Sequence, residues 1–328
     1  ITLKNGKEPG DRTGAGAYVN NSTLIMKGSS TITNCSAHKG GGVYVNNGTL
    51  IMQDSSAISS CTAVDKGSGV YVSGTFKMSG SAKVDTNSDV YLADGKSITV
   101  TGALSHRPAA RITPYSYTDG RVLATGDAEK ANFTVSPDSD GDKWRYKKVG
   151  NEIKFVKATL TVTFTQIKCV EEHDDGPNGE YYWTMKVDGE MISERKDENG
   201  KDEHGNWKRW VAGDGDTLDI SEKSFTGLFK FFPANKTIPV NIEIYEDDDT
   251  YDDHIGTTKA HLTYDYDNDQ WKWEYDGNWI SGPANELHGN QKKNSSKTIG
   301  DGGEEIFTEQ YRHSDGDTDV TIKIKWKE

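Results

Sequence analysis

The chain has 328 residues, of which only 33% are hydrophobic, and its formal net charge is −13 at pH 7. This length allows two domains with separate cores. The abundance of Gly, Ser, Thr, Asn and Asp favours strands and turns over helices. No apolar run approaches the ~20 residues needed to span a bilayer, and no helical apolar period persists over three turns. We therefore expect an all-β protein without a transmembrane segment.

Charge is divided unevenly along the chain. Residues 1–157 contain 19 Lys and Arg against 14 Asp and Glu, so the totals of 38 and 51 leave 19 against 37 for residues 158–328. An acidic second half repels nucleic acid and anionic lipid unless a cation neutralises it. Metal cations are the obvious candidates, and we expect no nucleic-acid partner.

A repeat of about 26 residues fills the first hundred positions. The segment at 14–21 (GAGAYVNN) returns at 40–47 and again at 67–74, and Leu-Ile-Met at 24–26 returns at 50–52 and as Phe-Lys-Met at 76–78. A unit of three short strands cannot bury its own apolar face, whereas stacked units can. The exchange of Ile25 and Ile51 for Lys77 marks an outward position. We predict a right-handed parallel β-helix that rises ~4.8 Å per coil.

These units resemble the repeats of bacterial polymorphic outer-membrane proteins and pectate-lyase-like surface adhesins. The resemblance rests on the Gly-Gly-hydrophobic pattern at 41–43 and on Val84-x-x-Asn87, although Cys35 and Cys61 replace the ladder Asn in two copies. It implies a secreted or cell-surface protein and carries no activity. Outward positions hold no clustered carboxylates, so we expect no catalysis in this half. Beyond Ser97 the repeat decays into strands that we expect to cap the helix, in a domain of residues 1–157.

The cysteines fit neither a disulfide scaffold nor a zinc site. Cys35 and Cys61 are 26 residues apart and fall at the same place in adjacent coils. Stacked neighbours have Cα atoms ~4.8 Å apart, but their parallel Cβ vectors hold the β-carbons beyond the ~3.8 Å mean of disulfides. We expect two free thiols that face each other across one coil step.

From Thr159 the pattern changes to long alternating strands rich in aromatic residues. Such strands predict an antiparallel β-sandwich over residues 158–328. We expect the boundary between Lys154 and Leu160, where the sequence contains no Gly, Pro or Ser and so no flexible linker. Trp271 and Trp273 share one strand face and are predicted to be core residues; exposed, they would form a sugar-stacking platform.

Acidic residues gather in three segments of this second half, at 173–180, 213–217 and 246–254. Six acids among the eight residues 246–253 repel one another unless a cation lies between them. Calcium takes six to eight oxygen ligands from carboxylates and carbonyls, often on closely spaced loop positions. A solvated acidic loop is the simpler alternative. The Asp-x-Asp-x-Asp run at 265–269 lacks flanking helices and is predicted to be a polar turn.

Residues 160–164, the acidic segment after them and the strand that ends at 186–187 resemble the start of a C2-type domain, the calcium- and lipid-binding sandwich of protein kinase C and synaptotagmin. Residues 242–256 are similar to the last calcium loop of that family. In this resemblance Asp253 matches the final loop aspartate and Asp247 the middle one. Tyr245 falls on the first aspartate, so either that ligand is lost or the loop has slipped, with Asp249 or Glu246 in its place.

In the first loop Asp174 or Asp175 matches the leading aspartate, and Glu180 stands where the family has Asp-Pro-Tyr. The resemblance thus implies a Ca²⁺ cofactor held by a set of acidic side chains. The candidate metal ligands are Asp174, Asp175, Glu180, Glu246, Asp247, Asp249, Asp252 and Asp253.

We expect a non-catalytic secreted or cell-surface binding or adhesion protein, in which a β-helix stalk presents a calcium-dependent sandwich. Its partner would be a glycan, a protein or a phospholipid headgroup. The alternative is a carbohydrate-binding or purely structural module in which calcium only stabilises the sandwich. No nucleophile–base pair or paired acids support an enzyme.

Overall fold

The computed structural model describes residues 1–172, 179–195, 210–212, 215–221, 223–229, 231–232, 237–247, 252–265, 268, 270–276, 297–300, 302–313 and 316–327. The chain forms two compact units: Ile1–Lys157 with Lys230–Ala234, and Ala158–Phe229 with Asn235–Glu328. Within these described ranges the regular elements are strands, apart from one short 3₁₀ helix, η1 (Lys130–Asn132). No helix in them has the length and apolar character needed to cross a membrane. The protein is all-β.

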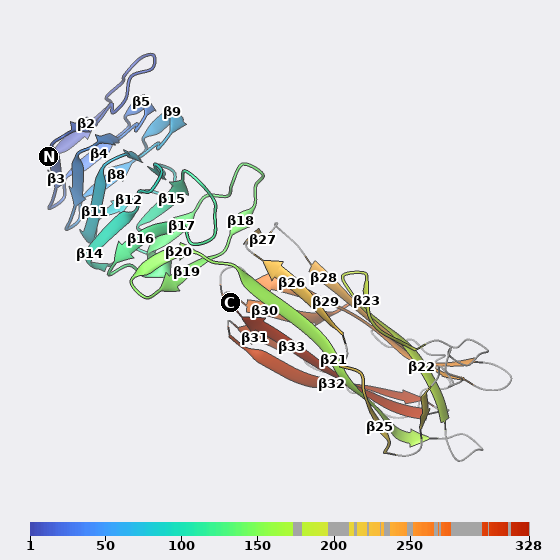
Figure 1. Ribbon diagram of the computed structural model, residues 1–328. Helices are drawn as coiled ribbons and strands as arrows, with labels where there is room; N and C mark the ends of the chain where they lie inside the picture. Colours follow the sequence, from blue (N-terminus) through green and yellow to red (C-terminus); the bar gives the residue numbers. More distant parts are fainter. Residues whose placement is uncertain are drawn as a thin grey trace. The chain divides into compact units, whose positions relative to one another are not determined.

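The first unit is a parallel β-helix with three faces (Figure 1). The first face contains β1 (Thr2–Lys4), β4 (Thr31–Thr33), β8 (Ala57–Ser59) and β12 (Lys83–Val84). The second contains β2 (Ala17–Asn20), β6 (Val43–Asn46), β10 (Val70–Val72), β13 (Val90–Leu92), β15 (Ala110–Pro114) and β17 (Phe133–Val135). The third contains β3 (Thr23–Met26), β7 (Thr49–Met52), β11 (Thr75–Gly80), β14 (Ile98–Leu104) and β16 (Val122–Gly126). A lateral pair, β5 (Ser36–Lys39) and β9 (Thr62–Lys66), was not predicted.

The pairing register between coils follows the sequence repeat. Leu24 pairs with Leu50 and Leu50 with Phe76, so equivalent residues lie directly above one another. Leu50 and Phe76 are fully buried, whereas Ile25 is 54% exposed. The predicted inward and outward positions are therefore confirmed, and one stripe of large apolar side chains forms a continuous core along the helix axis.

Glycine directly before the first three second-face strands, β2, β6 and β10, allows the coils to approach one another. A Cβ at Gly16 would lie 2.4 Å from the Gly42 carbonyl oxygen, and one at Gly42 would lie 2.5 Å from the Gly69 oxygen. A Cβ at Gly69 would in turn lie 2.5 Å from the Ser88 oxygen. These distances are far below van der Waals contact, so the repeat requires glycine here for reasons of space.

An aromatic ladder runs along the outer side of the second face. Tyr18 stacks on Tyr44 (ring centroids 5.6 Å apart), Tyr44 on Tyr71 (4.7 Å) and Tyr71 on Tyr91 (5.0 Å). Because the ring faces cover one another, the ladder stabilises the coil stack through ring contacts in addition to backbone hydrogen bonds.

Beyond Ser97 the strands β14, β15, β16 and β17 still pair in parallel, as further irregular coils of the helix. The cap that follows them has a geometry that the sequence did not predict. After β16, the strand β20 (Glu152–Phe155) pairs antiparallel with β16, and β19 (Tyr146–Val149) pairs antiparallel with β20. Beside them, β18 (Lys143–Trp144) pairs with β27 (Phe231–Phe232), a short segment that belongs to the first unit although it lies far along the chain. The hairpin of β19 and β20 reverses the chain direction, so the parallel stack ends there without a further coil.

Cys35 and Cys61 are free and buried, which confirms the sequence prediction. The Cys35 thiol donates to the Thr33 carbonyl oxygen (3.4 Å), and the Cys61 thiol to that of Ser59 (3.2 Å). Burial raises the pKa of Cys61 to about 11. The Cys61 thiol therefore stays protonated near neutral pH.

The second unit contains two antiparallel sheets (Figure 1). Sheet I has the order β25 (Thr217–Asp219), β21 (Ala158–Glu172), β33 (Gly316–Lys327) and β32 (Glu304–His313), with β26 (Ser224–Phe229) also on β21. Sheet II has the order β23 (Glu190–Arg195), β22 (Gly179–Val187), β28 (Thr237–Asp247), β29 (Asp252–Asp265), β30 (Gln270–Tyr275) and β31 (Lys297–Gly300), with β24 (Trp210–Ala212) also on β22.

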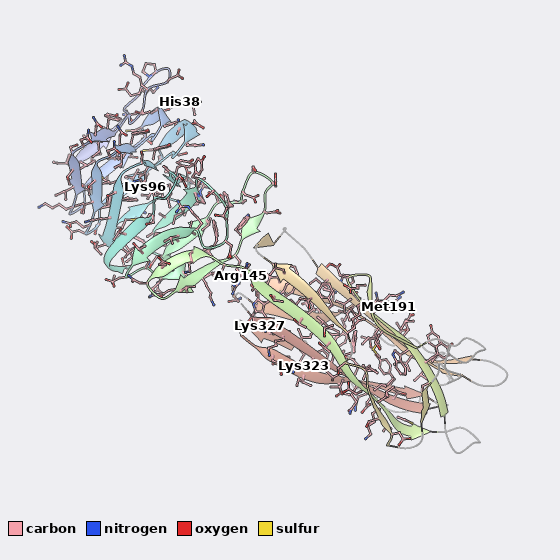
Figure 2. All side chains as sticks on the ribbon, viewed as in Figure 1. His38, Lys96, Arg145, Met191, Lys323 and Lys327 are labelled. Atoms are coloured by element: carbon pink, nitrogen blue, oxygen red, sulfur yellow. The ribbon has the colours of Figure 1, made fainter. Side chains whose placement is uncertain are left out.

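Large aromatic side chains fill the core of the second unit. Trp271 and Trp273 are fully buried, and Trp271 lies edge-on to Trp326 with ring centroids 5.9 Å apart. Polar side chains such as Lys323, which ion-pairs with Glu304 at 3.1 Å, lie on the outer face (Figure 2). The tryptophan stripe is thus a core feature, as predicted, and offers no sugar-stacking platform.

Candidate functional site

Strand pairing brings the flanks of several acidic segments to one end of the second unit. In sheet I, the last residue of β21, Glu172, pairs with Gly316 at the start of β33. In sheet II, Gly179 at the start of β22 pairs with Ala212. Tyr181 pairs with Glu246 of β28, which pairs with Asp253 of β29. Only six residues separate Glu172 from Gly179, so these positions share one end, which we call the acidic end.

Four short segments of the chain start and finish at this end. Residues 173–178 join β21 to β22, residues 248–251 join β28 to β29, residues 213–214 follow β24, and residues 314–315 join β32 to β33. Gly215 donates its N–H to the carbonyl of Cys169 (2.9 Å), and Cys169 donates to that of Asp216 (3.0 Å), so the chain directly after the third segment is fixed to β21. The sequence predicted that the first two segments share a metal site. The strand register shows that the strand ends beside Asp214 and Asp315 lie at the same end, which no local motif predicts.

The predicted metal ligands divide into two groups. Asp174, Asp175 and Asp249 lie outside the described residues. The backbones of Glu180, Glu246, Asp247, Asp252 and Asp253 lie in strands at the acidic end, and their side chains are not among those described. Among the side chains that are described, no three His, Cys, Asp or Glu groups are placed to hold a metal ion.

The acids on β28 and β29 are direct cross-strand partners. Glu246 pairs with Asp253, and Asp247 pairs with Asp252. Like charges directly opposite each other in an antiparallel pair are destabilising. The register thus places two opposed acid pairs at consecutive positions at the end of the hairpin, one pair on each face of the ribbon. A bound cation would offset the repulsion within a pair.

An irregularity in this hairpin lies next to the acids. The register shifts between Ile244 and Glu246, because one extra residue of β29 is accommodated there. Tyr245 at the shift stacks on Tyr182 of β22, with parallel rings and centroids 4.8 Å apart. Burial, with a smaller contribution from Glu243, raises the pKa of Tyr245. The position that matches the first aspartate of the resembled family therefore holds a packed aromatic ring.

At the opposite end of sheet II, between β29 and β30, Asp265 and Asn268 are the described residues of the Asp-x-Asp-x-Asp run. The Asp265 carboxylate accepts hydrogen bonds from the Asn268 backbone (3.2 Å) and side-chain amide (3.0 Å), and it pairs with Lys272 at 2.8 Å. The hydrogen bond from Lys272, followed by that from Asn268, lowers the pKa of Asp265. This carboxylate is already satisfied by protein groups, in agreement with the predicted polar turn.

No family model matches the chain, and no curated protein matches it. A C2 domain protein from Ramazzottius varieornatus is similar to 52% of this chain over 88% of its own length, with 12% identity and a TM-score of 0.23. A C2 domain of plant Extended Synaptotagmin 1 is similar to 52% of this chain over 94% of its own length, with 8% identity and a TM-score of 0.23. The architecture of the second unit follows from its own strand pairing.

Proposed function

We propose that the second unit is a calcium-dependent binding module and that its acidic end is the metal site. The observation that carries this proposal is the register of β28 and β29, which sets Glu246 opposite Asp253 and Asp247 opposite Asp252. Two adjacent pairs of opposed acids at a strand end lower stability when nothing lies between them. They lie at one end of a domain with a charge of −18, from 19 basic and 37 acidic residues, and a cation that binds there would offset the repulsion.

The chemistry of the donor set fits calcium. All eight candidate ligands are carboxylates, which are hard oxygen donors, and calcium accepts six to eight of these in a flexible geometry. Asp174 and Asp175 follow Glu172 by two and three residues, so the chain can bring them to the acidic end; Asp249 lies in the segment between Asp247 and Asp252. Bound calcium would supply positive charge and open coordination positions for the oxygens of a ligand.

The whole chain, in this proposal, is a non-catalytic secreted or cell-surface binding protein that combines a repeat-built β-helix with this module. The ligand would present phosphate or hydroxyl oxygens to the ion, as a phospholipid headgroup or a glycan does. The alternative in which calcium only stabilises the sandwich predicts the same metal binding but no ligand. Burial of Trp271 and Trp273 weighs against a sugar-binding role for that stripe.

Binding assays with and without calcium test the proposal. The full chain is applied to glycan arrays and to liposomes that contain phosphatidylserine, in about 2–5 mM CaCl₂, a concentration of the order that extracellular modules need, and again in EDTA. We expect binding only with calcium, and we expect Asp247→Asn together with Asp253→Asn to abolish it.

A matched control removes two acidic charges from the opposite end of the same sheet. Asp188 and Glu190 lie beyond Val187, at the far end of β22 from Glu180. Asp188 has a positive φ of 51°, which asparagine tolerates, and the Glu190 ion pair with Lys223 is half-exposed and contributes little. The double variant Asp188→Asn, Glu190→Gln should bind like the unmodified protein. Equal loss in both double variants would point to net charge instead of a site.

A further inference from the structure

A cavity of about 410 Å³ opens on the first unit where the β-helix is capped. Its walls come from the end of β14, from Arg107, from the end of β16 and from the turn between β19 and β20. Small-ligand sites commonly have volumes of about 300–1,000 Å³. None of the sequence motifs described above accounts for this cavity.

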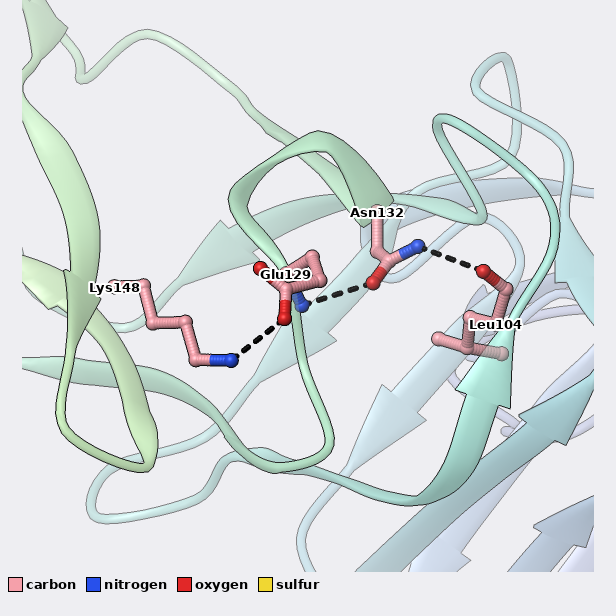
Figure 3. A network of polar contacts seen from close by, with 4 residues as sticks. All are labelled: Leu104, Glu129, Asn132 and Lys148. Carbon is pink, nitrogen blue, oxygen red and sulfur yellow. Dashed lines mark hydrogen bonds and ion pairs between the residues drawn. The ribbon is translucent and has the colours of Figure 1, made fainter.

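A buried amide holds the cavity walls in place (Figure 3). Asn132, only 1% exposed, donates from Nδ2 to the carbonyl oxygens of Leu104 (3.2 Å) and His106 (3.3 Å). Its Oδ1 accepts from the backbone N–H of Glu129 (2.9 Å). One side chain therefore ties the end of β14 to the segment before η1, and both segments line the cavity.

The opposite wall is fixed through the backbone. Gly126 donates its N–H to the Asn151 carbonyl oxygen (3.1 Å), which joins the end of β16 to the β19–β20 turn. Gly126 has a φ of +82°, and a Cβ there would lie 2.1 Å from the Val100 carbonyl oxygen. Glycine is therefore required at this wall, and the cavity has its shape before any ligand enters.

The charges that line the cavity fall into two sets. Lys148 donates from Nζ to Glu129 Oε1 at 2.6 Å, so this pair neutralises itself (Figure 3). Arg107 and Asp127 are exposed, and within the described part of the chain neither side chain has an ion-pair or hydrogen-bond partner. The cavity thus offers one guanidinium and one carboxylate that are both available to a ligand.

We propose that this cavity binds a compact zwitterion, a free α-amino acid, through its two charges. The carboxylate of the ligand would accept from the Arg107 guanidinium, which suits bidentate recognition of carboxylates. Its ammonium group would donate to Asp127. Asn151 also lines the cavity, so its side-chain amide could form further hydrogen bonds with the ligand. A zwitterion neutralises both available charges at once.

Other small polar ligands match the lining less well. A sugar acid would pair with Arg107 but leave Asp127 without a cation. A neutral sugar would leave both charges without partners, and none of the described lining side chains is an aromatic ring on which a sugar could stack. Charge complementarity therefore favours the amino acid.

Matched ligands separate these possibilities. Saturation-transfer NMR and ¹H–¹⁵N shift titrations on the full chain, in EDTA, would compare L-serine with ethanolamine, which lacks the carboxylate, and with 3-hydroxypropanoate, which lacks the amine. Glucuronate and glucose serve as sugar probes. We expect L-serine to shift the amides of Gly126 and Asn151, and each half-charged analogue to bind about tenfold more weakly or worse, because one charge-assisted hydrogen bond is lost.

Variants assign the binding to the cavity. Arg107→Ala and Asp127→Asn should each weaken L-serine binding by about tenfold or more without a change in melting temperature, because both side chains are exposed. Arg12→Ala, which removes a 78% exposed arginine on the N-terminal coil, should leave binding unchanged. The proposal is overturned if L-serine does not bind, if 3-hydroxypropanoate or glucuronate binds as well as L-serine, or if Arg107→Ala has no effect. EDTA keeps this outcome independent of the calcium proposal.

Discussion

Substitution of Gly42 by alanine tests whether the close approach of coils determines the stability of the β-helix. The added Cβ would lie 2.5 Å from the Gly69 carbonyl oxygen and 2.8 Å from Cγ2 of Ile58. The first distance is about 0.9 Å short of ordinary contact, which begins at 3.4 Å. The Gly69 oxygen cannot turn away, because it accepts the N–H of Val43 at 2.9 Å in the next strand pairing.

The cost follows from this geometry. Extra atoms in a well-packed core destabilise by about 1–3 kcal/mol, since side chains and backbone must shift. Loss of glycine flexibility in the unfolded chain would offset about 0.4–1 kcal/mol of this. For a unit of this size each kcal/mol lowers the melting temperature by about 2–4 °C. We therefore expect Gly42→Ala to lower the transition of the first unit by several degrees.

Gly102→Ala is the matched control on the third face. The nearest atom to a Cβ at Gly102 is the Ser79 Cβ at 3.8 Å, which is ordinary contact. This variant should melt at the same temperature as the unmodified protein or slightly above it. Differential scanning calorimetry of the two variants gives the comparison, and equal melting temperatures for Gly42→Ala and Gly102→Ala would refute the spacing argument.

Three further predictions concern single groups. Mass spectrometry without reductant should find no peptide that links Cys35 to Cys61. Because Cys61 is buried and its pKa is about 11, it should react with thiol reagents far more slowly in the folded protein than in urea. Because the pKa of Asp265 is lowered in the fold, its contribution to stability is present above the unfolded value of about 3.9 and is lost as the pH falls below it; Asp265→Asn should flatten the acid limb of the stability profile. Tyr311→Phe removes a buried hydrogen bond to Thr258 (2.8 Å) and should cost about 1–3 kcal/mol in urea unfolding, whereas an unchanged midpoint would show that the bond contributes nothing.

The β-helix could be predicted residue by residue because comparison of its repeats shows which positions face the core and which face solvent. Exchange of Ile25 and Ile51 for Lys77 shows which side faces solvent, and equal spacing gives the strand register directly. The lateral pair β5–β9 was missed because its residues are mostly polar and do not alternate. The pairing of Phe231 and Phe232 with β18 was missed because nothing local reports contact with residues so far back along the chain.

The candidate site could be predicted only in part. The resemblance to the last calcium loop of C2-type domains identified Asp247 and Asp253 as candidates, but strand order depends on long-range pairing that no local pattern reveals. The opposition of Glu246 to Asp253 is therefore visible only in the register of β28 and β29. The pairing of β32 with β33 likewise brings the strand ends beside Asp315 to the acidic end. The cavity at Arg107 and Asp127 escaped sequence analysis because its walls come from separate segments of the chain.

Calorimetric scans at increasing calcium concentration test whether the second unit binds calcium. If calcium binds only the folded second unit, it adds about 2.7 kcal/mol when it is a hundredfold above its dissociation constant, which raises the transition of that unit by about 5–11 °C. Magnesium should substitute poorly. Asp247→Asn with Asp253→Asn should remove the shift and leave the calcium-free melting temperature equal or higher, because the opposed acids on β28 and β29 no longer repel each other. A second-unit transition that does not move at several millimolar calcium would rule out a calcium site there and leave the acidic end as a solvated surface.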